Sequence, residues 1–248
     1  MPKFFVSPEQ IYDEEILVLG NDAKHISLSL RMKVGDPIVI CNTNKRDYEC
    51  IISSIDSGVV KAEIISSSIC QSEPPFSIKL FQCLPKGDKF EYIIQKSVEL
   101  GVSSVVPVFS SRCIAKPVEK SKEKKNDRYN KISYEAASQS GRGIIPVVYD
   151  CINLERAFEI AANDGMAFIC YEENNSLSLK KYLEDNLKTA KINSNISFFI
   201  GPEGGFSKEE IELAREYGIR SVGLGKRILR TETASSYVLS ALSYITEL

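Results

Sequence analysis

A glycine-rich turn near the C-terminus is where residue types and spacing first suggest chemistry. The stretch "SFFIGPEGGFSKEE", Ser197–Glu210, runs from an apolar segment through three glycines into a helix start. Glycine lets backbone amides approach a ligand without a Cβ in the way. The chain contains neither the P-loop spacing nor the GxGxxG dinucleotide spacing. We therefore predict a ligand-binding turn without a phosphate fingerprint, and a tight turn that binds nothing is the alternative.

Local signals fix the geometry of this turn. Ser207 is a natural N-cap, and Glu210 stands three residues later, so the two predict a capping box. Phe206 and Ile211 occupy the two positions of a hydrophobic staple. A helix is therefore expected to begin directly after Ser207.

A second loop, "LGKRILRTETA", places Lys226, Arg227 and Arg230 just before a helix expected to begin near Thr231 or Glu232. The start of a helix favours anions, so three cations there are unfavourable unless a negative group arrives. This favours nucleic-acid contact over a purely stabilising role. The apolar residues that follow recur at helical spacing, which is more often typical of a core or a subunit contact than of a cofactor site.

These loops belong to a region of strand–helix alternation that begins at Ile78. Apolar segments predict strands at 78–84, 102–109, 144–149, 167–171, 196–200 and 221–225. Helices are expected between them, at about 89–100, 122–140, 154–162 and 179–187, and Asp88 with Glu91 suggests a capping box for the first. This pattern predicts a parallel α/β sheet with helices on both faces. Ligands bind beyond the carboxyl ends of such strands, where the loops "YEENN", "GPEGGF" and "GKRILRTETA" follow.

The first 70 residues have a different rhythm. Short apolar segments separated by turn residues predict strands, interrupted by a short helix over Asp22–Leu30. We expect a small, mostly β barrel-like domain there. The segment "CQSEPPFS", residues 70–77, resembles a linker because it holds a Pro-Pro pair among polar residues.

Composition narrows the functional class. The 248 residues carry a formal net charge of -2, so no strong overall field implies nucleic acid or a membrane. Seven scattered cysteines without CxxC spacing favour free thiols over disulfides or a zinc cluster. The single histidine, His25, excludes a two-histidine metal site within one chain and weakens a Ser-His-Asp hydrolase. No segment looks like a secretory signal or a membrane helix, so a cytoplasmic protein is expected. The cysteine and histidine pattern also leads us to expect no bound metal.

Taken together, these motifs resemble the RsmE family of 16S rRNA methyltransferases, which belong to the SPOUT class. The resemblance rests on "FFIGPEGGFSKEEIELA" and "LGKRILRTETASSYVLSAL", with "CLPKGDKFEYIIQKSVELGV" and "ISYEAASQSGRGIIPVV" upstream. It implies a PUA-like RNA-binding domain over residues 1–72 and a methyltransferase domain with a trefoil knot over 73–248. It also implies a homodimer that methylates N3 of a uridine in the 30S subunit, using S-adenosylmethionine (SAM).

The resemblance also implies site residues. The knot loops would bind SAM mostly through backbone groups, at Tyr171, Ile200, Gly201, Gly205, Leu224, Gly225, Ile228 and Leu229. A cation near the pyrimidine oxygens would stabilise the deprotonated uridine, and Arg230 and Arg142 are the candidates, the latter beside Gln139. Glu232 would orient Arg230 or assist proton removal. RNA contacts are expected from Arg31, Lys86, Arg112 and the basic stretch Lys116–Lys131.

Two departures from the family pattern concern the RNA contacts. Ser111-Arg112-Cys113 stands where the family commonly has Glu-Arg-Ser, and the N-terminal hairpin reads "CNTNKRDYEC" instead of a glycine-rich sequence. Three other interpretations stay open at this point. They are a SPOUT methyltransferase acting on another RNA nucleotide, a non-catalytic RNA-binding ribosome-assembly factor, and a nucleotide-binding protein of flavodoxin-like order.

Overall fold

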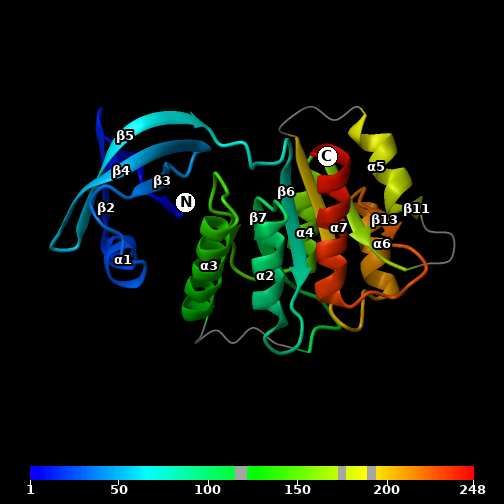
Figure 1. Ribbon diagram of the computed structural model, residues 1–248. Coiled ribbons are helices and arrows are strands. Elements are labelled where there is room, and N and C mark those ends of the chain that lie inside the picture. Colours follow the sequence, from blue (N-terminus) through cyan, green and yellow to red (C-terminus); the bar gives the residue numbers. More distant parts are fainter. Residues whose placement is uncertain (115–121, 173–176, 189–193) are drawn as a thin grey trace. The chain divides into compact units, whose positions relative to one another are not determined.

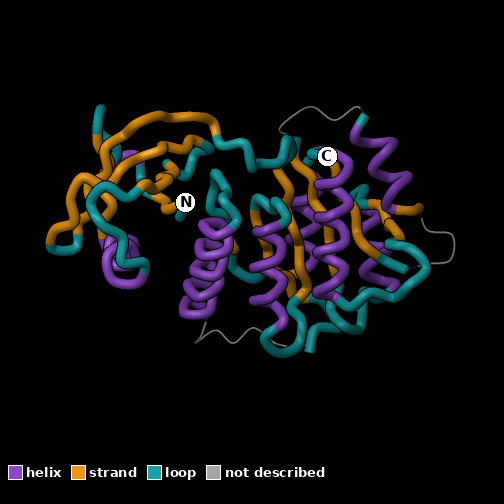
Figure 2. The backbone as a smooth tube through the Cα atoms, in the orientation of Figure 1, coloured by secondary structure: helices purple, strands orange, loops and turns teal. Residues whose placement is uncertain are grey.

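The chain folds into two compact units (Figures 1 and 2). The computed structural model describes residues 1–114, 122–172, 177–188 and 194–248. Unit 1 comprises Met1–Glu73 and Ala137–Ile145, and unit 2 comprises Pro74–Ala136 and Pro146–Leu248. Within the described ranges, none of the helices is both long and apolar enough to cross a bilayer.

Unit 1 is built around a curled β-sheet with the order β1-β3-β4-β5-β2. Its strands are β1 (Lys3–Phe5), β2 (Glu15–Leu19), β3 (Pro37–Cys41), β4 (Arg46–Asp56) and β5 (Val59–Ile69). Alternating apolar residues such as Ile16, Ile38, Ile40 and Ile52 are completely buried between the strands. The long β4–β5 hairpin contains two register shifts, which bend a sheet and increase its twist. The expected mostly β domain is confirmed.

The helical segment of unit 1 differs from its prediction. Instead of one helix over Asp22–Leu30, the chain forms α1 (Gly20–Lys24) and then a π-helical turn, η2 (His25–Ser29), and a short 3₁₀ turn, η1 (Pro8–Gln10), precedes β2. The Ser27 hydroxyl donates to the carbonyl oxygen of Ala23 at 2.8 Å. Such side-chain bonds compete with the regular backbone ladder of a helix.

Unit 2 contains a sheet in which every described strand pair is parallel. In the described part of the chain its order is β11-β13-β10-β12-β6-β7-β8, with β9 paired to β7. The strands are β6 (Ser77–Cys83), β7 (Ser104–Phe109), β8 (Val147–Val148), β9 (Ile152–Asn153), β10 (Met166–Cys170), β11 (Leu177–Ser178), β12 (Asn195–Ile200) and β13 (Arg220–Gly223). The helices are α2 (Lys89–Glu99), α3 (Lys122–Gln139, whose last residues belong to unit 1), α4 (Leu154–Ala162), α5 (Leu179–Leu187), α6 (Lys208–Glu216) and α7 (Thr231–Thr246).

Helices cover both faces of this sheet, as predicted (Figure 1). On one face Phe81 and Phe199 stack at 4.5 Å between ring centroids and pack with Phe158 of α4 and Ile211 of α6. On the other face Phe168 lies 5.1 Å from the ring of Tyr182 in α5. Helices α2 and α7 pack against each other, and α7 also contacts β12. The trefoil knot stays a prediction.

Two local predictions in unit 2 meet different outcomes. The capping box of α6 is confirmed, because the Glu210 N–H donates to Ser207 Oγ and the Ser207 N–H donates to Glu210 Oε2. The capping box expected at Asp88 is wrong, because Asp88 makes no side-chain cap bond. Glu91 instead accepts a hydrogen bond from Arg128 at 2.7 Å. Its carboxylate therefore serves a helix–helix ion pair.

The substitution Ser207→Ala is expected to lower the free energy of unfolding by about 1 kcal/mol, because the Glu210 N–H loses its acceptor. Urea denaturation followed by circular dichroism measures the change. Ser240→Ala, on an exposed position of α7, is the control, and it should change stability by less than about 0.5 kcal/mol. Equal effects of the two substitutions would contradict a stabilising cap.

Candidate active site

A cavity of about 530 Å³ opens in unit 2 among the loops that follow β10, β12 and β13. Because parallel strands end at the same edge of a sheet, these three loops meet there. The structure brings together all the residues predicted to surround SAM: Tyr171, Ile200, Gly201, Gly205, Leu224, Gly225, Ile228 and Leu229. Arg230 and Arg112 also line the cavity, whereas Glu232, Arg142, Gln139, Lys86 and Arg31 are not among its lining residues.

The glycines of the two main loops are required by their backbone. A Cβ on Gly201 would lie 3.2 Å from the backbone of Gly205, so the loop folds closely on itself there. Gly205 has φ +64° and Gly225 has φ +111°, a region that side chains rarely adopt. Ile228, at the tip of the second loop, is 86% exposed. Glycine and aliphatic residues therefore line both loops, together with the charged side chains of Glu203, Arg227 and Arg230.

A buried polar network ties these walls together. Gln82, at the end of β6, is completely buried, and its Nε2 donates to Thr231 Oγ1 at 2.9 Å. The Thr231 hydroxyl donates in turn to the carbonyl oxygen of Gly201 at 2.7 Å. Thr231 is the first residue of α7, and Gly201 is the first residue after β12. The network therefore fixes the spacing of the two loops.

Charged residues cluster at one side of the cavity. Lys89, the first residue of α2, places its Nζ 3.2 Å from Glu203 Oε1 and 3.5 Å from Glu232 Oε2. The Lys86 N–H also donates to Glu203 Oε1, at 3.1 Å. Burial acts to raise the pKa of Glu203, but hydrogen bonds from backbone N–H groups and from Lys89 outweigh burial and hold this pKa below its ordinary value. The hydrogen bond to Glu203 raises the pKa of Lys89.

The turn that departs from the family pattern supports the glycine loop. The Ser111 N–H donates to Glu210 Oε1 at 2.7 Å, and Arg112 Nη1 donates to the carbonyl oxygen of Gly204 at 2.8 Å. The third residue of this turn, Cys113, is buried, and hydrogen bonding from Cys83 lowers its pKa to about 6. Arg112 thus holds the loop besides lining the cavity, and its RNA contact stays a prediction.

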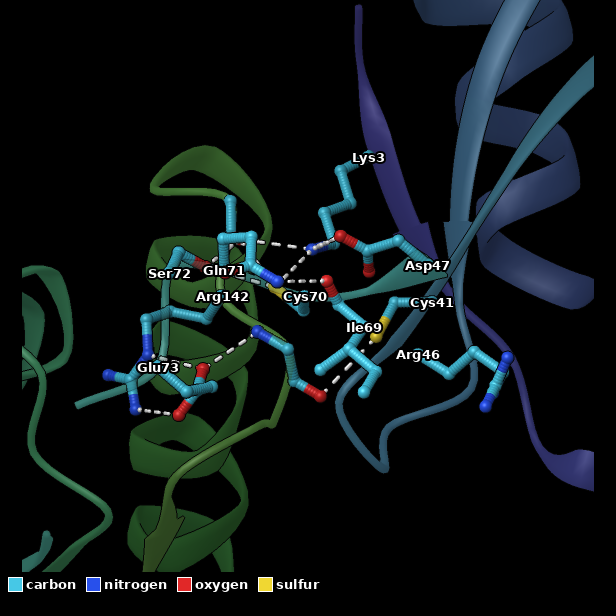
Figure 3. Close-up of polar contacts among 12 residues, drawn as sticks. Lys3, Cys41, Arg46, Asp47, Ile69, Cys70, Gln71, Ser72, Glu73 and Arg142 are labelled. Atoms are coloured by element: carbon cyan, nitrogen blue, oxygen red, sulfur yellow. Dashed lines mark hydrogen bonds and ion pairs between the residues drawn. The ribbon is translucent and has the colours of Figure 1, made fainter. Parts of the chain in front are cut away.

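Arg142 and Gln139 are not among the residues that line this cavity, and both belong to unit 1. The Arg142 side chain is only 2% exposed, and its Nε and Nη2 donate to the two carboxylate oxygens of Glu73 at 2.8 and 2.9 Å (Figure 3). Glu73 also accepts from the Gly143 N–H. The guanidinium is therefore held in a buried ion pair within unit 1, and a catalytic role for Arg142 and Gln139 stays a prediction.

The same cluster corrects the expectation of a linker at residues 70–77. Lys3 Nζ donates to Asp47 Oδ2 at 2.8 Å and to the carbonyl oxygen of Gly141 at 3.0 Å, beside Cys70 (Figure 3). The Ser72 hydroxyl donates to the same carbonyl oxygen. The first residues of the expected linker are therefore part of the packed structure of unit 1.

The remaining residues predicted to contact RNA lie outside the cavity. Arg31 is exposed and has φ 53°, in a turn of unit 1. Lys86 is exposed in the turn before α2. The basic stretch Lys116–Lys131 falls partly outside the described residues, which resume at Lys122. In the described part, Arg128 pairs with Glu91 and Lys131 lies 3.9 Å from Glu135.

Comparison with protein families gives matches over most of the chain. Residues 72–243 match the model of the RNA methyltransferase domain, and residues 18–65 match the RNA methyltransferase PUA domain. Ribosomal RNA small subunit methyltransferase E of Bacillus subtilis is 33% identical, with 100% of this chain and 98% of the relative covered. The chain belongs to the ribosomal RNA small subunit methyltransferase E family. The Synechocystis member is 30% identical over 99% of this chain and 78% of its own length.

Solved structures agree with this family. The Neisseria gonorrhoeae ribosomal RNA small subunit methyltransferase E, bound to S-adenosyl methionine, superposes with a TM-score of 0.85 at 29% identity, covering 99% of this chain and 98% of that one. A Legionella pneumophila protein solved with bound SAM gives 0.84 at 28% identity, covering 98% and 97%. The expected SPOUT-class fold with a PUA-like domain is thus confirmed.

Sequence reasoning missed Lys89, Glu203 and Gln82. Glu203 stands inside the glycine motif, but as one exposed-looking acid between Pro and Gly it carried no signal of its own. Gln82 is a polar residue within an otherwise apolar strand, and this contrast could have marked it. Lys89 reads as an ordinary first-turn residue, and only the fold brings it to Glu203.

Replacing Arg142 with Met should destabilise unit 1 by about 3–5 kcal/mol, because it leaves the Glu73 carboxylate buried without its partner. The double variant Arg142→Met with Glu73→Leu should recover much of this loss, because no unpaired charge remains. Thermal unfolding of both variants measures the effect. A single variant as stable as the parent protein would contradict a structural ion pair.

Proposed function

We propose that this protein transfers a methyl group from SAM to N3 of a uridine in the 16S rRNA of the small ribosomal subunit. The observation that carries the proposal is the glycine-lined cavity at the carboxyl ends of β10, β12 and β13, in a chain of this family. The relatives from N. gonorrhoeae and L. pneumophila are named as bound to SAM. The family relatives are named for ribosomal RNA of the small subunit.

The residues present fit the cofactor. The cavity volume of about 530 Å³ lies within the range of small-molecule sites. The close approach at Gly201 and the positive φ of Gly205 and Gly225 leave backbone groups accessible in both walls. We propose that these glycines, with Ile200 and Leu224, hold SAM, and that Ile228, Leu229 and Tyr171 complete the enclosure. Bound SAM would supply a methyl group that is activated because it is attached to a sulfonium. The rest of the cofactor would then be released as a neutral thioether.

The protein's main task is then to position the base and to stabilise its anion. The N3–H proton of uridine must leave before N3 can take the methyl group, and negative charge spreads onto O2 and O4. Arg230 is exposed at the N-terminus of α7 and lines the cavity. We propose that its guanidinium stabilises this anion. Glu232 contacts Lys89 and not Arg230 in the structure, so its part is to hold Lys89.

The partners follow from the same proposal. We propose that residues 1–72 act as an RNA-binding domain and 73–248 as the catalytic domain, with Arg31, Lys86 and Arg112 contacting RNA of the 30S subunit. A homodimer is supported by the exposed apolar side chains of Tyr92 on α2 and of Tyr237, Tyr244 and Ile245 on α7. A cytoplasmic location accords with a ribosomal substrate.

Transfer of tritium-labelled methyl groups to unmethylated 30S subunits and to free 16S rRNA, followed by mass-spectrometric mapping, tests the function. We expect one uridine to gain a methyl at N3. Methylation of another base or of a ribose would identify a different RNA methyltransferase, and RNA binding without any SAM binding would identify an assembly factor.

Arg230→Ala should lower the rate of methyl transfer by about 100-fold or more, because one charge-stabilising donor is lost. The SAM dissociation constant, measured by calorimetry, should change little. Lys208→Ala is the matched control, since Lys208 is an exposed cation at the start of α6 that does not line the cavity. A near-normal rate in folded Arg230→Ala protein would exclude this role.

Gly225→Ala should weaken SAM binding at least about tenfold, because alanine at φ +111° costs roughly 1–3 kcal/mol and displaces the loop. Gly58→Ala is the control, because Gly58 has a similarly positive φ of +86° in the turn between β4 and β5 of unit 1 and does not line the cavity. Calorimetric titration compares the two. Equal affinities would show that the second loop does not form the cofactor site.

A further inference from the structure

A lysine and a glutamate lie side by side on the cavity wall. Lys89 and Glu203 both line the cavity, and Lys89 Nζ lies 3.2 Å from Glu203 Oε1. The two side chains are about one-third exposed, at 36% and 34%. They therefore offer a hydrogen-bond donor next to a hydrogen-bond acceptor on one accessible wall.

Additional contacts with Lys86 and Glu232 hold the Glu203 and Lys89 side chains in place. Glu203 accepts from the Lys86 N–H at 3.1 Å, within a turn whose Gly87 has φ +70°. Lys89 Nζ also lies 3.5 Å from Glu232 Oε2, which makes an ion pair with it. Glu232 Oε2 is buried and makes no hydrogen bond to another described residue, so the Lys89 ammonium is its counter-charge. Since Glu232 does not line the cavity, it secures the ammonium without competing for a ligand. The pair is thus fixed by α2, α7 and the loop after β12.

This arrangement complements one edge of uracil. Uracil presents the N3–H donor beside the O4 acceptor, whereas cytosine presents an N3 acceptor beside an amino donor. Enzymes that modify a base read such an edge by hydrogen bonds after extruding the base. A carboxylate next to an ammonium matches uracil and opposes cytosine.

We propose that Glu203 and Lys89 bind the N3–H and O4 groups of the target uracil, and that Glu203 is the general base of the reaction. This inference rests on the proposed function. The N3–H proton moves to a carboxylate oxygen of Glu203, and the electron pair of that bond stays on N3 and spreads toward O4. The Lys89 ammonium donates to O4 and stabilises the charge. Glu203 then returns the proton to water after the product leaves.

The charges of the site agree with these roles. Hydrogen bonds hold the pKa of Glu203 below its ordinary value, so the carboxylate is ionised at neutral pH but is a weaker base than a free glutamate. Proton transfer from N3 to Glu203 therefore depends on the Lys89 and Arg230 cations, which stabilise the uracil anion. Glu172 is the other carboxylate on the cavity wall, and it is exposed, with no ion pair among the described residues. Glu203 is therefore the wall carboxylate that is both oriented and paired with a donor.

Substitutions of Glu203, Lys89, Glu172 and Lys96 test the inference by single-turnover methyl transfer to 30S subunits and by SAM calorimetry. Glu203→Gln should slow transfer by roughly 100- to 10,000-fold, because the amide cannot take the proton. Lys89→Met should slow it by about 10- to 100-fold, and Lys89→Arg should restore most of the rate because it keeps a cationic donor. The SAM dissociation constant should stay within about threefold throughout. Lys96→Met is the control, since it breaks the Lys96–Glu99 ion pair elsewhere on α2.

The outcomes separate this inference from its alternatives. If the ion pair only stabilises the fold, Glu203→Gln and Lys89→Met would lose equal amounts of rate and stability, and Lys89→Arg would bring no specific recovery. A Glu203→Gln enzyme within threefold of the wild-type rate, or a comparable loss in Glu172→Gln alone, would overturn the assignment of the base. Wild-type protein that methylates a different nucleotide would instead contradict the proposed function, before any variant is compared.

Discussion

The hydrogen bond between Gln82 and Thr231 is the constraint on which the candidate site depends. A buried amide among apolar strand residues is costly unless it is bonded, and the Gln82 Nε2 donates both to Thr231 Oγ1 and to the carbonyl oxygen of Cys83, although Gln82 Oε1 has no hydrogen-bond partner among the described residues. Through Thr231 the bond reaches the carbonyl oxygen of Gly201 and links the end of β6 to the loops after β12 and β13. These two hydrogen bonds fix the spacing of the loops, so the glycine turns themselves can stay open to a ligand.

Two ion pairs of the protein differ in how accessible they are to a ligand. Arg142 and Glu73 form a buried, bidentate pair within unit 1, and such a pair holds structure without being available to a substrate. Lys89 and Glu203 form a pair of similar length on an accessible wall, where each keeps unused hydrogen-bonding capacity. Both are pairs of a cation with a glutamate, and the difference in exposure leaves only the second accessible to a ligand.

Much of the fold followed from the sequence, because its signals are local. Alternating strands and helices predicted the parallel sheet, and the Ser207–Glu210 cap was confirmed in detail. Predictions failed where distant contacts decide. Asp88 makes no side-chain cap bond, and Glu91 pairs with Arg128. Of the expected strand at 144–149, only Val147–Val148 form β8, although the Tyr149 N–H also donates to the carbonyl oxygen of Val105 in β7. The motif around Arg142 also did not predict its ion pair with Glu73, because Glu73 lies far away in the sequence.

Hydrogen–deuterium exchange with and without SAM most directly tests the claim that the two glycine loops enclose the cofactor. The account predicts slower exchange of backbone amides in residues 200–206 and 224–231 when SAM is added. The loop after β6, at residues 84–88, should respond less because it contacts Glu203 and not the proposed cofactor groups. Unit 2 also has another cavity, lined in part by Asp164, Tyr182 and Arg220. Protection confined to that cavity, or no protection at all, would contradict the proposed SAM site.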